Sequence, residues 1–526
     1  MKVLVSDSLS EQGITILKKS GLSVDINTKL TPEQLIQTIG QYDGLVIRSG
    51  TKVTKEVIAA ATNLKVIGRA GSGLDNVDLP AATKRGIAVM NTPGGNTITT
   101  AEHAFALIFS MARQTPQANA SVKSGKWEKN KFMGVELFDK TLGIIGFGQI
   151  GSWVARLAQG AGMKVIAFDP YLSPENAQKA GVELVDLTTL YGRSDIITLH
   201  TPMTPETKYL INAEAISKMK DGVRIVNCAR GGIVEETALL NALTSGKVAA
   251  SASDVFEKEP VDPNHPLLKL DNFICTPHLG AATTEAQENV ALAIAEQVVD
   301  YLVRGVVRYA VNLPSVPLDL MPKVQPYVLL AEKIGSFIGQ TIDGGITAVT
   351  IEYHGEVAAL QLAPIHIAAV KGLLSPILKE TVNYVNAPSI AKERGIEIQE
   401  IKSDNAGNFA SLLTMRVTTS SGKKSVSGAV FHKTEPRFVE VDGMALEIVP
   451  EGEMLYIHND DQPGVIGGLG QILAKNKVNI SRMQLGRESP GGLAISVVGI
   501  DLPVTELILK EIRTIPHVLS VRPVRL

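Results

Sequence analysis

The sequence has few cysteines, few aromatic residues and no excess of charge of either sign. Only two of its 526 residues are cysteines, Cys228 and Cys275, which excludes a disulfide framework and a CxxC zinc pair, and we expect no metal site. Lys and Arg number 51 against 53 Asp and Glu, so there is no basic excess for a nucleic-acid backbone or an anionic membrane surface. No apolar run reaches the roughly 18 residues of a membrane span. These absences predict a cytoplasmic protein without nucleic-acid or membrane partners.

Short apolar strands alternate with helical patterns from the N-terminus onward. Alternation of this kind argues for βαβ units around parallel sheets, and the length allows about three to five domains. The expected strands are residues 3–5, 44–47, 64–67, 87–89, 142–145, 164–168, 196–199, 224–227, 249–254 and 273–275. The last six have the spacing of a doubly wound dinucleotide-binding domain.

The chain changes in character at a proline-punctuated boundary, residues 312–317. Beyond it, residues 318–450 combine a helical segment with alternating, glycine-interrupted strands. The last module starts at Met454 and has the element order βαββαβ, which is compatible with a ferredoxin-like fold. We therefore expect an α/β protein with doubly wound parallel sheets, followed by two smaller α+β regions.

A glycine-rich loop follows the apolar segment 142–145 and opens a helix. The loop consists of Gly146, Phe147, Gly148, Gln149, Ile150 and Gly151. Its first glycine permits a tight turn, its second lets the backbone approach a pyrophosphate, and its third packs the helix on the strand. Asp169 ends the next strand, where a carboxylate would bind ribose hydroxyls and repel a 2′-phosphate. The pattern predicts NAD rather than NADP, while a strand-end turn before Pro170 is the structural alternative for Asp169.

Three later strands are followed by residues suited to acid–base chemistry: Arg230 in NCARGG, Glu259 in DVFEKEP and His278 in TPHLG. Ligands in open α/β sheets bind outside the carboxyl ends of the strands, so these segments can converge on one crevice. Hydride transfer from an alcohol needs a base such as His, a carboxylate that orients it, and an Arg that holds a substrate carboxylate. Each residue alone has an ordinary structural explanation. Their order after a nucleotide fingerprint favours the catalytic interpretation.

The motifs GFGQIG, NCARGG, DVFEKEP and TPHLGAAT resemble those of the D-2-hydroxyacid dehydrogenase family over about residues 1–315. The resemblance implies that His278 is the acid/base, Glu259 its partner and Arg230 the substrate clamp. It also implies that Thr201 and Asp254 contact the cofactor. In the family fold, residues 1–97 and 283–315 form one substrate-binding domain beside a nucleotide-binding domain, residues 98–282.

Two further segments, residues 68–78 and 125–134, are similar to the branch of this family that oxidises 3-phosphoglycerate in phosphorylated serine biosynthesis. A phosphorylated substrate needs cations at the far end of the cleft. Arg48 and Arg69 follow apolar strands and are candidates for that role, and Lys129 is a candidate that would enter from a neighbouring subunit, although all three could be ordinary surface cations. The family resemblance, rather than the spacing of charges, decides for 3-phosphoglycerate. It further implies a homotetramer.

The two C-terminal regions are similar to the long form of that branch, which adds an intervening, allosteric-substrate-binding domain (316–450) and an ACT domain (454–526). By this resemblance, Asn459, Asp461 and Asn479 bind L-serine as a feedback effector across a subunit interface. A structural turn without a ligand is the alternative. The basic residues near His432, Lys433 and Arg437 suit either a second anion site or a solvated face.

Two other functions fit parts of the same pattern. A glyoxylate or hydroxypyruvate reductase would keep Arg230, Glu259 and His278, but it gives no role to an amino-acid-binding module. An NAD-sensing corepressor, which binds partners without catalysis, would use the same architecture, but the chain lacks a basic patch.

Overall fold

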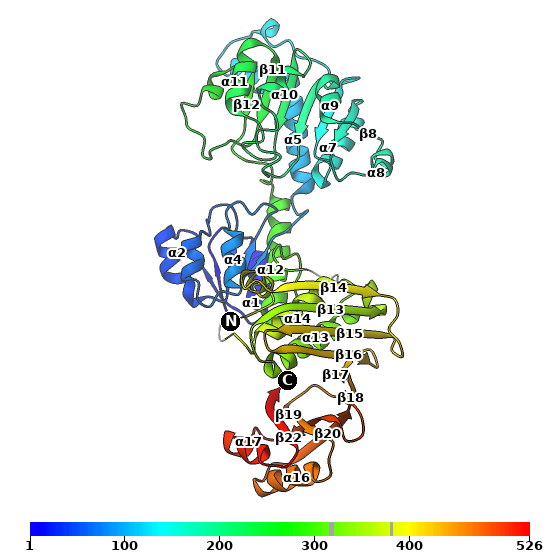
Figure 1. Cartoon of the computed structure of the whole chain (residues 1–526). Coiled ribbons are helices and arrows are strands. Elements are labelled where there is room, and N and C mark those ends of the chain that lie inside the picture. Colours follow the sequence, from blue (N-terminus) through cyan, green and yellow to red (C-terminus); the bar gives the residue numbers. More distant parts are fainter. Residues whose placement is uncertain (315–319, 379–381) are drawn as a thin grey trace.

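The computed structural model describes residues 1–314, 320–378 and 382–526. Two all-parallel sheets in the N-terminal part are followed by a mixed sheet and an antiparallel one, which confirms the predicted α/β class. Figure 1 shows the second parallel sheet at one end of the molecule and the antiparallel sheet, in orange and red, at the other. None of the helices within the described ranges is long and apolar enough to cross a membrane.

The first sheet has the strand order β2-β1-β3-β4-β5. Its strands are β1 (Lys2–Val5), β2 (Ser23–Ile26), β3 (Gly44–Ile47), β4 (Val66–Arg69) and β5 (Ala88–Met90). The helical elements between them are α1 (Glu11–Lys19), α2 (Pro32–Thr38), η1 (Ile39–Gln41), α3 (Lys55–Ala60) and α4 (Leu79–Arg85). The sequence did not predict β2, because it is a short edge strand with no fully buried side chain.

A late segment of the chain returns to this first sheet. Helix α12 (Thr284–Arg304) contributes Ile294 and Val298 to the core that β1 and β4 form. Beyond the helix, Asn312 Oδ1 accepts a hydrogen bond from the Val89 backbone N–H at 2.9 Å. The last residues before the proline-rich boundary are therefore tied to the first sheet.

The second sheet has the strand order β12-β11-β10-β9-β6-β7-β8. Its strands are β6 (Thr141–Ile145), β7 (Lys164–Phe168), β8 (Glu183–Leu184), β9 (Ile196–Leu199), β10 (Val223–Asn227), β11 (Val248–Ser253) and β12 (Phe273–Cys275). Its helical elements are α5 (Thr97–Arg113), α6 (Thr115–Lys123), η2 (Lys129–Lys131), α7 (Gln149–Gly160), α8 (Pro174–Lys179), α9 (Leu187–Arg193), α10 (Ala213–Ser217), α11 (Glu236–Ser245) and η3 (Pro266–Lys269). The strand order reverses between β6 and β9, and this switch point places a ligand crevice at their carboxyl ends.

The third sheet, of order β14-β13-β15-β16-β17-β18, is parallel only between β13 and β14. Its strands are β13 (Ile346–Gly355), β14 (Glu397–Ser403), β15 (Ser411–Thr419), β16 (Gly422–Phe431), β17 (Glu435–Val441) and β18 (Met444–Ile448), and its helical elements are α13 (Met321–Thr341), η4 (Glu356–Ala359), α14 (Leu362–Leu374) and α15 (Ala387–Glu393). A Cβ at Gly335 or Gly372 would lie within 2.2 Å of a backbone oxygen of the facing helix, so these glycines allow α13 and α14 to pack closely.

The fourth sheet has the order β20-β21-β19-β22. Its elements are β19 (Glu453–Asp460), α16 (Val465–Lys475), β20 (Ile480–Arg487), β21 (Leu493–Ile500), α17 (Glu506–Arg513) and β22 (Val518–Arg525), which is the βαββαβ order that the sequence predicts. Helices α16 and α17 cover one face. The other face packs on α13, where the rings of Tyr456 and Phe337 lie 5.2 Å apart.

Candidate active site

The carboxyl ends of β6 and β9 meet at the glycine loop. Gly146 has a φ of 91°, and a Cβ there would lie 2.7 Å from the His200 carbonyl oxygen, so only glycine fits. A Cβ at Gly151 would lie 2.2 Å from the Gly146 oxygen, which explains how α7 approaches β6 so closely. Gly148, the N-cap of α7, has open space where its Cβ would be. There is thus open space beside the N-terminus of α7, the end of a helix at which a pyrophosphate can bind.

The two residues between these glycines have structural partners. Gln149 Oε1 accepts a hydrogen bond from Thr97 Oγ1 at 3.0 Å, and thereby joins the loop to the start of α5. Ile150 is half-buried against the core between α5 and the sheet. Their side chains are thus held by α5 and by the core, while their backbone forms the first turn of α7.

Asp169 and Thr201 lie at the ends of the strands that flank β6. Asp169 accepts hydrogen bonds from the backbone N–H groups of Phe147 at 2.7 Å and Tyr171 at 2.8 Å, so its carboxylate stays beside the glycine loop. The buried Oγ1 of Thr201 has no hydrogen-bond partner among the described residues. A buried hydroxyl without a partner calls for a ligand or a water. Together with the space beside Gly148, these groups fit NAD.

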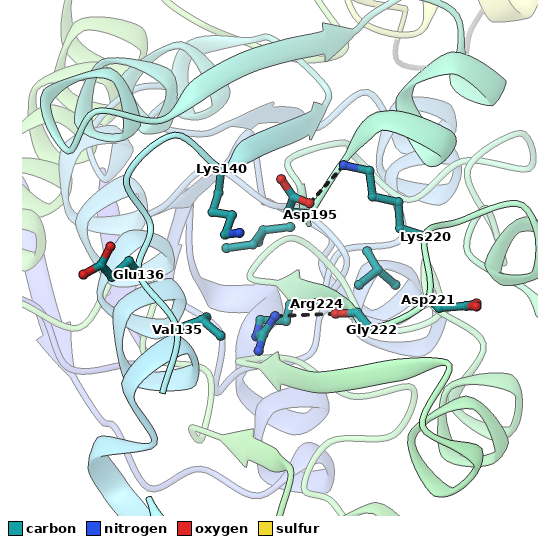
Figure 2. A pocket seen from close by; sticks show the side chains of 10 residues that line it. Val135, Glu136, Lys140, Asp195, Lys220, Asp221, Gly222 and Arg224 are labelled. Carbon is teal, nitrogen blue, oxygen red and sulfur yellow. Dashed lines mark hydrogen bonds and ion pairs between the residues drawn. The ribbon is translucent and has the colours of Figure 1, made fainter. Parts of the chain in front are cut away.

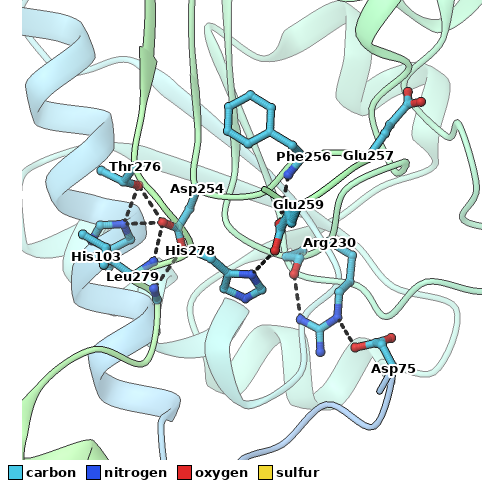
Figure 3. Close-up of polar contacts among 12 residues, drawn as sticks. Asp75, His103, Arg230, Asp254, Phe256, Glu257, Glu259, Thr276, His278 and Leu279 are labelled. Carbon is cyan, nitrogen blue, oxygen red and sulfur yellow. Dashed lines mark hydrogen bonds and ion pairs between the residues drawn. The ribbon is translucent and has the colours of Figure 1, made fainter. Parts of the chain in front are cut away.

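His278 and Glu259 form a close pair at the carboxyl edge of the second sheet. His278 Nδ1 lies 2.7 Å from Glu259 Oε2 (Figure 3), so Nδ1 donates its proton and Nε2 is left for a ligand. The hydrogen bond to Glu259 raises the pKa of His278 against the opposing effect of burial. Burial raises the pKa of Glu259, but the bonds from His278 and from the Phe256 N–H at 3.1 Å outweigh it, and the net pKa is lowered.

Arg230 bridges the two parallel sheets. Its Nε donates to Asp75 Oδ2 at 3.0 Å, and its Nη1 donates to the Ala229 carbonyl at 2.7 Å (Figure 3). Asp75 follows β4 of the first sheet, whereas Arg230 follows β10 of the second. Asn227 shapes the turn, because its side chain accepts from the Ala229 N–H and donates to the Arg230 carbonyl.

Arg69 is the last residue of β4, and Arg48 follows the neighbouring strand β3. The buried Nε of Arg69 has no hydrogen-bond partner among the described residues, and burial, followed by the charge of Arg230, lowers its pKa to about 10. The charge of Arg48 acts in the same direction. Cβ atoms at Gly71 and Gly73 would lie 2.0 Å from Arg69 Nη1 and 2.2 Å from Arg230 Nη2, so this glycine-rich loop lets both guanidiniums lie against it. Positive charge is concentrated where an anion could bind.

Asp254 holds the segment that follows β12. It is 1% exposed, and its Oδ1 accepts from Thr276 Oγ1 at 2.6 Å and the Leu279 N–H at 2.7 Å, while Oδ2 accepts from the Gly280 N–H at 2.8 Å. His103 Nε2 of α5 lies 3.2 Å from Oδ1. Both carboxylate oxygens of Asp254, which was predicted to contact the cofactor, therefore already accept hydrogen bonds from the protein.

The three predicted effector residues do not lie together in one chain. Asn459 accepts from Ser496 Oγ at 3.2 Å, and Asp461 accepts from Arg487 Nη1 at 2.9 Å, both at the same end of the fourth sheet. Asn479 instead donates to Asp501 at 2.9 Å, beyond the opposite end of β21. The register places the two ends about 20 Å apart.

The remaining basic residues lie outside this crevice. Lys129 is exposed in η2 and makes no ion pair or hydrogen bond with the described residues. Arg437 pairs with Glu435 and Glu447, each at 2.8 Å, which favours a solvated face over an anion site.

A hollow of about 100 Å³, seen in Figure 2, contains the pair of Lys220 and Asp195 at 2.9 Å. It opens at the amino ends of β6, β9 and β10, the edge opposite the crevice.

The sequence alone assigned no role to Asp75, Gly71, Gly73, His103 or Thr276. The first three lie in the segment GRAGSGLDNVD, which carried part of the family resemblance but in which only Arg69 was given a role. His103 lies in the apolar run of α5, where one histidine resembles a core residue. Their roles depend on contacts between distant segments, which sequence spacing does not encode.

Known proteins match the whole chain. The NAD-binding domain of the D-isomer specific 2-hydroxyacid dehydrogenases matches residues 105–280, the D-3-phosphoglycerate dehydrogenase intervening domain matches 323–442, and the ACT domain matches 454–517. Curated D-3-phosphoglycerate dehydrogenases of Synechocystis sp. and Archaeoglobus fulgidus are each 45% identical over 100% of this chain, and over 95% and 100% of their own lengths. The chain belongs to the D-3-phosphoglycerate dehydrogenase family. This membership confirms the predicted NAD-dependent oxidoreductase class and the ACT domain.

Solved structures agree for the part of the family fold that they share. A glyoxylate reductase from Paecilomyes thermophila is 31% identical with a TM-score of 0.55, and it covers 59% of this chain and 98% of its own. A formate dehydrogenase from Staphylococcus aureus, solved with NAD, is 29% identical with a TM-score of 0.53, over 59% and 97%. Both match only part of the chain, whereas D-3-phosphoglycerate dehydrogenases match all of it. The full-length match favours this family over the reductase alternative.

Proposed function

We propose that this protein oxidises 3-phospho-D-glycerate to 3-phosphohydroxypyruvate with NAD, in the first step of phosphorylated L-serine biosynthesis. One observation carries the proposal beyond family membership. The bonded pair of His278 and Glu259 lies on the same crevice as Arg230, and the charges of Arg230 and Arg48 both act on Arg69. An acid/base and a group of cations meet where a phosphorylated hydroxyacid needs both.

In this proposal His278 is the acid/base and Glu259 its partner. His278 Nε2 accepts the hydroxyl proton of the substrate as the alcohol carbon becomes a carbonyl, while Nδ1–H stays bonded to Glu259. NAD, when bound, supplies the acceptor for the hydride that leaves the same carbon. Glu259 then stabilises the resulting imidazolium, as its effect on the pKa of His278 indicates.

Arg230 is the proposed clamp for the substrate carboxylate. A carboxylate in the crevice can replace Asp75 on its guanidinium, because Asp75 is a weak competitor with a mostly exposed side chain. Arg69 and Arg48 would bind the phosphate, which supplies the partner that buried Arg69 Nε lacks. The exposed Lys129 would enter the crevice of a neighbouring subunit.

For the cofactor, we propose that Gly146, Gly148, Gln149, Ile150 and Gly151 bind the pyrophosphate and Asp169 the adenosine ribose. Thr201 would contact the cofactor through its free hydroxyl. Asp254, whose oxygens the chain already uses, would reach the carboxamide side of the nicotinamide only through the segment it holds.

We further propose a homo-oligomer, a tetramer by family resemblance, located in the cytoplasm. Large apolar side chains are exposed along one segment of the second-sheet region, namely Phe109, Val122, Trp127, Met133 and Phe138. A cluster of this kind is typical of a protein interface. Both cysteines are free, which suits a reducing compartment.

L-Serine is the proposed effector of the fourth sheet. Asn459 and Asp461 of one subunit would meet Asn479 of another, because one chain holds them at opposite ends of its sheet.

The proposed domains are residues 1–97 with 283–315, then 98–282, 316–450 and 454–526. The return of α12 to the first sheet supports the first of these.

The test is NADH formation with 3-phosphoglycerate or D-glycerate, each with and without L-serine. We expect a strong preference for the phosphorylated acid and suppression by serine. Equal rates on D-glycerate would favour a glyoxylate or hydroxypyruvate reductase. No turnover on either acid, with NAD binding retained, would favour an NAD-sensing binding protein.

A further inference from the structure

Helix α5 holds the segment that carries His278 at two points, one helical turn apart. Thr100 Oγ1 donates to the Gly280 carbonyl at 2.7 Å, on the far side of His278. His103 Nε2 lies 3.1 Å from Thr276 Oγ1 and 3.2 Å from Asp254 Oδ1, on the near side (Figure 3). These contacts come from a helix that supplies none of the proposed reacting groups.

The segment needs such support because its backbone is strained at His278. The φ of His278 is 56°, in the left-handed region that non-glycine residues rarely adopt. Its N–H donates to the Asp254 carbonyl at 2.9 Å, and the next two N–H groups donate to the Asp254 carboxylate. Asp254 thus fixes the backbone on which the imidazole is mounted.

His103 is the group that completes this arrangement. Thr276 Oγ1 gives its only proton to Asp254 at 2.6 Å, so the contact between His103 and Thr276 requires Nε2 of His103 to be the donor. The same Nε2–H faces Asp254 Oδ1. Burial raises the pKa of Asp254, but the hydrogen bond from His103, followed by those from Thr276 and Leu279, lowers it overall.

We infer that His103 is a positioning residue for His278, acting through Asp254 and Thr276. This inference rests on the proposed function of His278 as the acid/base. The polar contacts of His103 are with Thr276 and Asp254, and through them it helps to keep Asp254 ionised and bonded to the segment. The charged groups that face His278 are Glu259, Asp254 and Arg230. Those that face Asp254 are His103, His278 and Glu259, with the neutral thiol of Cys228, whose pKa is raised by burial and by Asp254.

The test compares His103→Leu, which removes the donor, with His103→Gln, whose amide can still donate from nearly the same place. His366→Leu is the matched control, because His366 also bonds a carboxylate, Glu400 at 3.1 Å, but lies in the third-sheet region. For His103→Leu we expect kcat/KM to fall about threefold to tenfold, the worth of one hydrogen bond. Loss of the His103 hydrogen bond raises the pKa of Asp254, so the Asp254 carboxylate is less fully ionised. It then stabilises the imidazolium of His278 less, and the low-pH limb of the pH profile should move to lower pH. His103→Gln should restore most of both.

A second readout does not depend on chemistry. Amide hydrogen exchange of peptides covering residues 276–283 should accelerate in His103→Leu and stay unchanged in His366→Leu, measured on the full-length protein with NAD. An unmoved pH limb together with unchanged exchange would overturn the inference. If His278→Asn keeps full activity, the proposed acid/base role fails instead, and the exchange experiment still decides whether His103 holds the segment.

Discussion

The two walls of the crevice differ in how completely their polar groups are bonded. On the second-sheet wall, His278, Glu259 and Asp254 each have close partners, with distances of 2.6 to 2.8 Å. On the first-sheet wall, Arg69 has a buried Nε without a partner among the described residues, and the pKa of its guanidinium is lowered to about 10. The acid–base groups of the second-sheet wall are organised before any substrate arrives, whereas Arg69 on the first-sheet wall still has a polar atom without a partner.

This difference assigns separate tasks to the two walls. Groups that must act at the reacting carbon gain from being fixed in advance, because no reorganisation is then required during the reaction. A buried cation without a partner is costly, so an anion that binds it recovers that cost on association. The first-sheet wall is therefore suited to capture the substrate, and the second-sheet wall to react with it. Substitutions that alter one wall at a time should therefore affect either the reaction or the binding of substrate.

The largest effect is expected on the second-sheet wall, from His278→Asn. Asparagine cannot take up the hydroxyl proton, so kcat should fall by about two to four orders of magnitude, the usual contribution of a general base. Binding of NAD, followed by fluorescence titration, should be unchanged because the glycine loop is intact. A kcat within threefold of the unmodified protein would contradict the assignment.

The next effect belongs to the first-sheet wall. Arg69→Met removes a charged donor with little loss of apolar contact, and we expect kcat/KM for 3-phosphoglycerate to fall about tenfold to a hundredfold. The loss should appear mainly in KM, and D-glycerate, which lacks the phosphate, should be oxidised as before. Arg85→Met, an exposed arginine in the last turn of α4, is the matched control. An equal loss with both substrates would mean that Arg69 supports the fold and does not select the phosphate.

The same division shows what the sequence could and could not predict. The second-sheet wall follows from it, because fixed motifs at strand ends place Arg230, Glu259 and His278 on one edge of a sheet of known topology. On the first-sheet wall, the positions of Arg48 and Arg69 after apolar strands made them candidates only, because whether they face the crevice depends on how two separate sheets approach each other. Asp75 and His103 were missed for the same reason. Their partners lie 155 residues away, for Asp75, and across the helix–sheet interface, for His103.

The pH dependence provides a smaller and more selective test of the second-sheet wall. Glu259 raises the pKa of His278, so oxidation, which requires the neutral imidazole, should be limited by protonation at low pH and increase as the pH rises. Reduction requires the imidazolium and should show the opposite trend. Glu259→Gln removes the charge, and the low-pH limb of oxidation should then move to lower pH. The measurement is the pH profile of kcat/KM in both reaction directions, for the unmodified protein and for Glu259→Gln. A low-pH limb that is unchanged in Glu259→Gln would mean that a group other than His278 titrates there.

The smallest effect on basal turnover should come from the fourth sheet, which lies far from both walls. Asp461→Ala and Asn479→Ala should leave kcat and KM nearly unchanged without effector, because each residue bonds only neighbours within its own sheet region. Both should weaken inhibition by L-serine. The two residues lie at opposite ends of one chain's sheet, so a shared site would take Asp461 from one subunit and Asn479 from another. When the two variants are mixed and their subunits exchange, some interfaces combine the intact Asp461 of the Asn479→Ala subunit with the intact Asn479 of the Asp461→Ala subunit, and serine inhibition should partly return. Inhibition that recovers in the mixture would support a shared site. Inhibition that stays lost in the mixture, with subunit exchange verified, would place the effector within a single chain and would limit the family resemblance to the fold of this sheet.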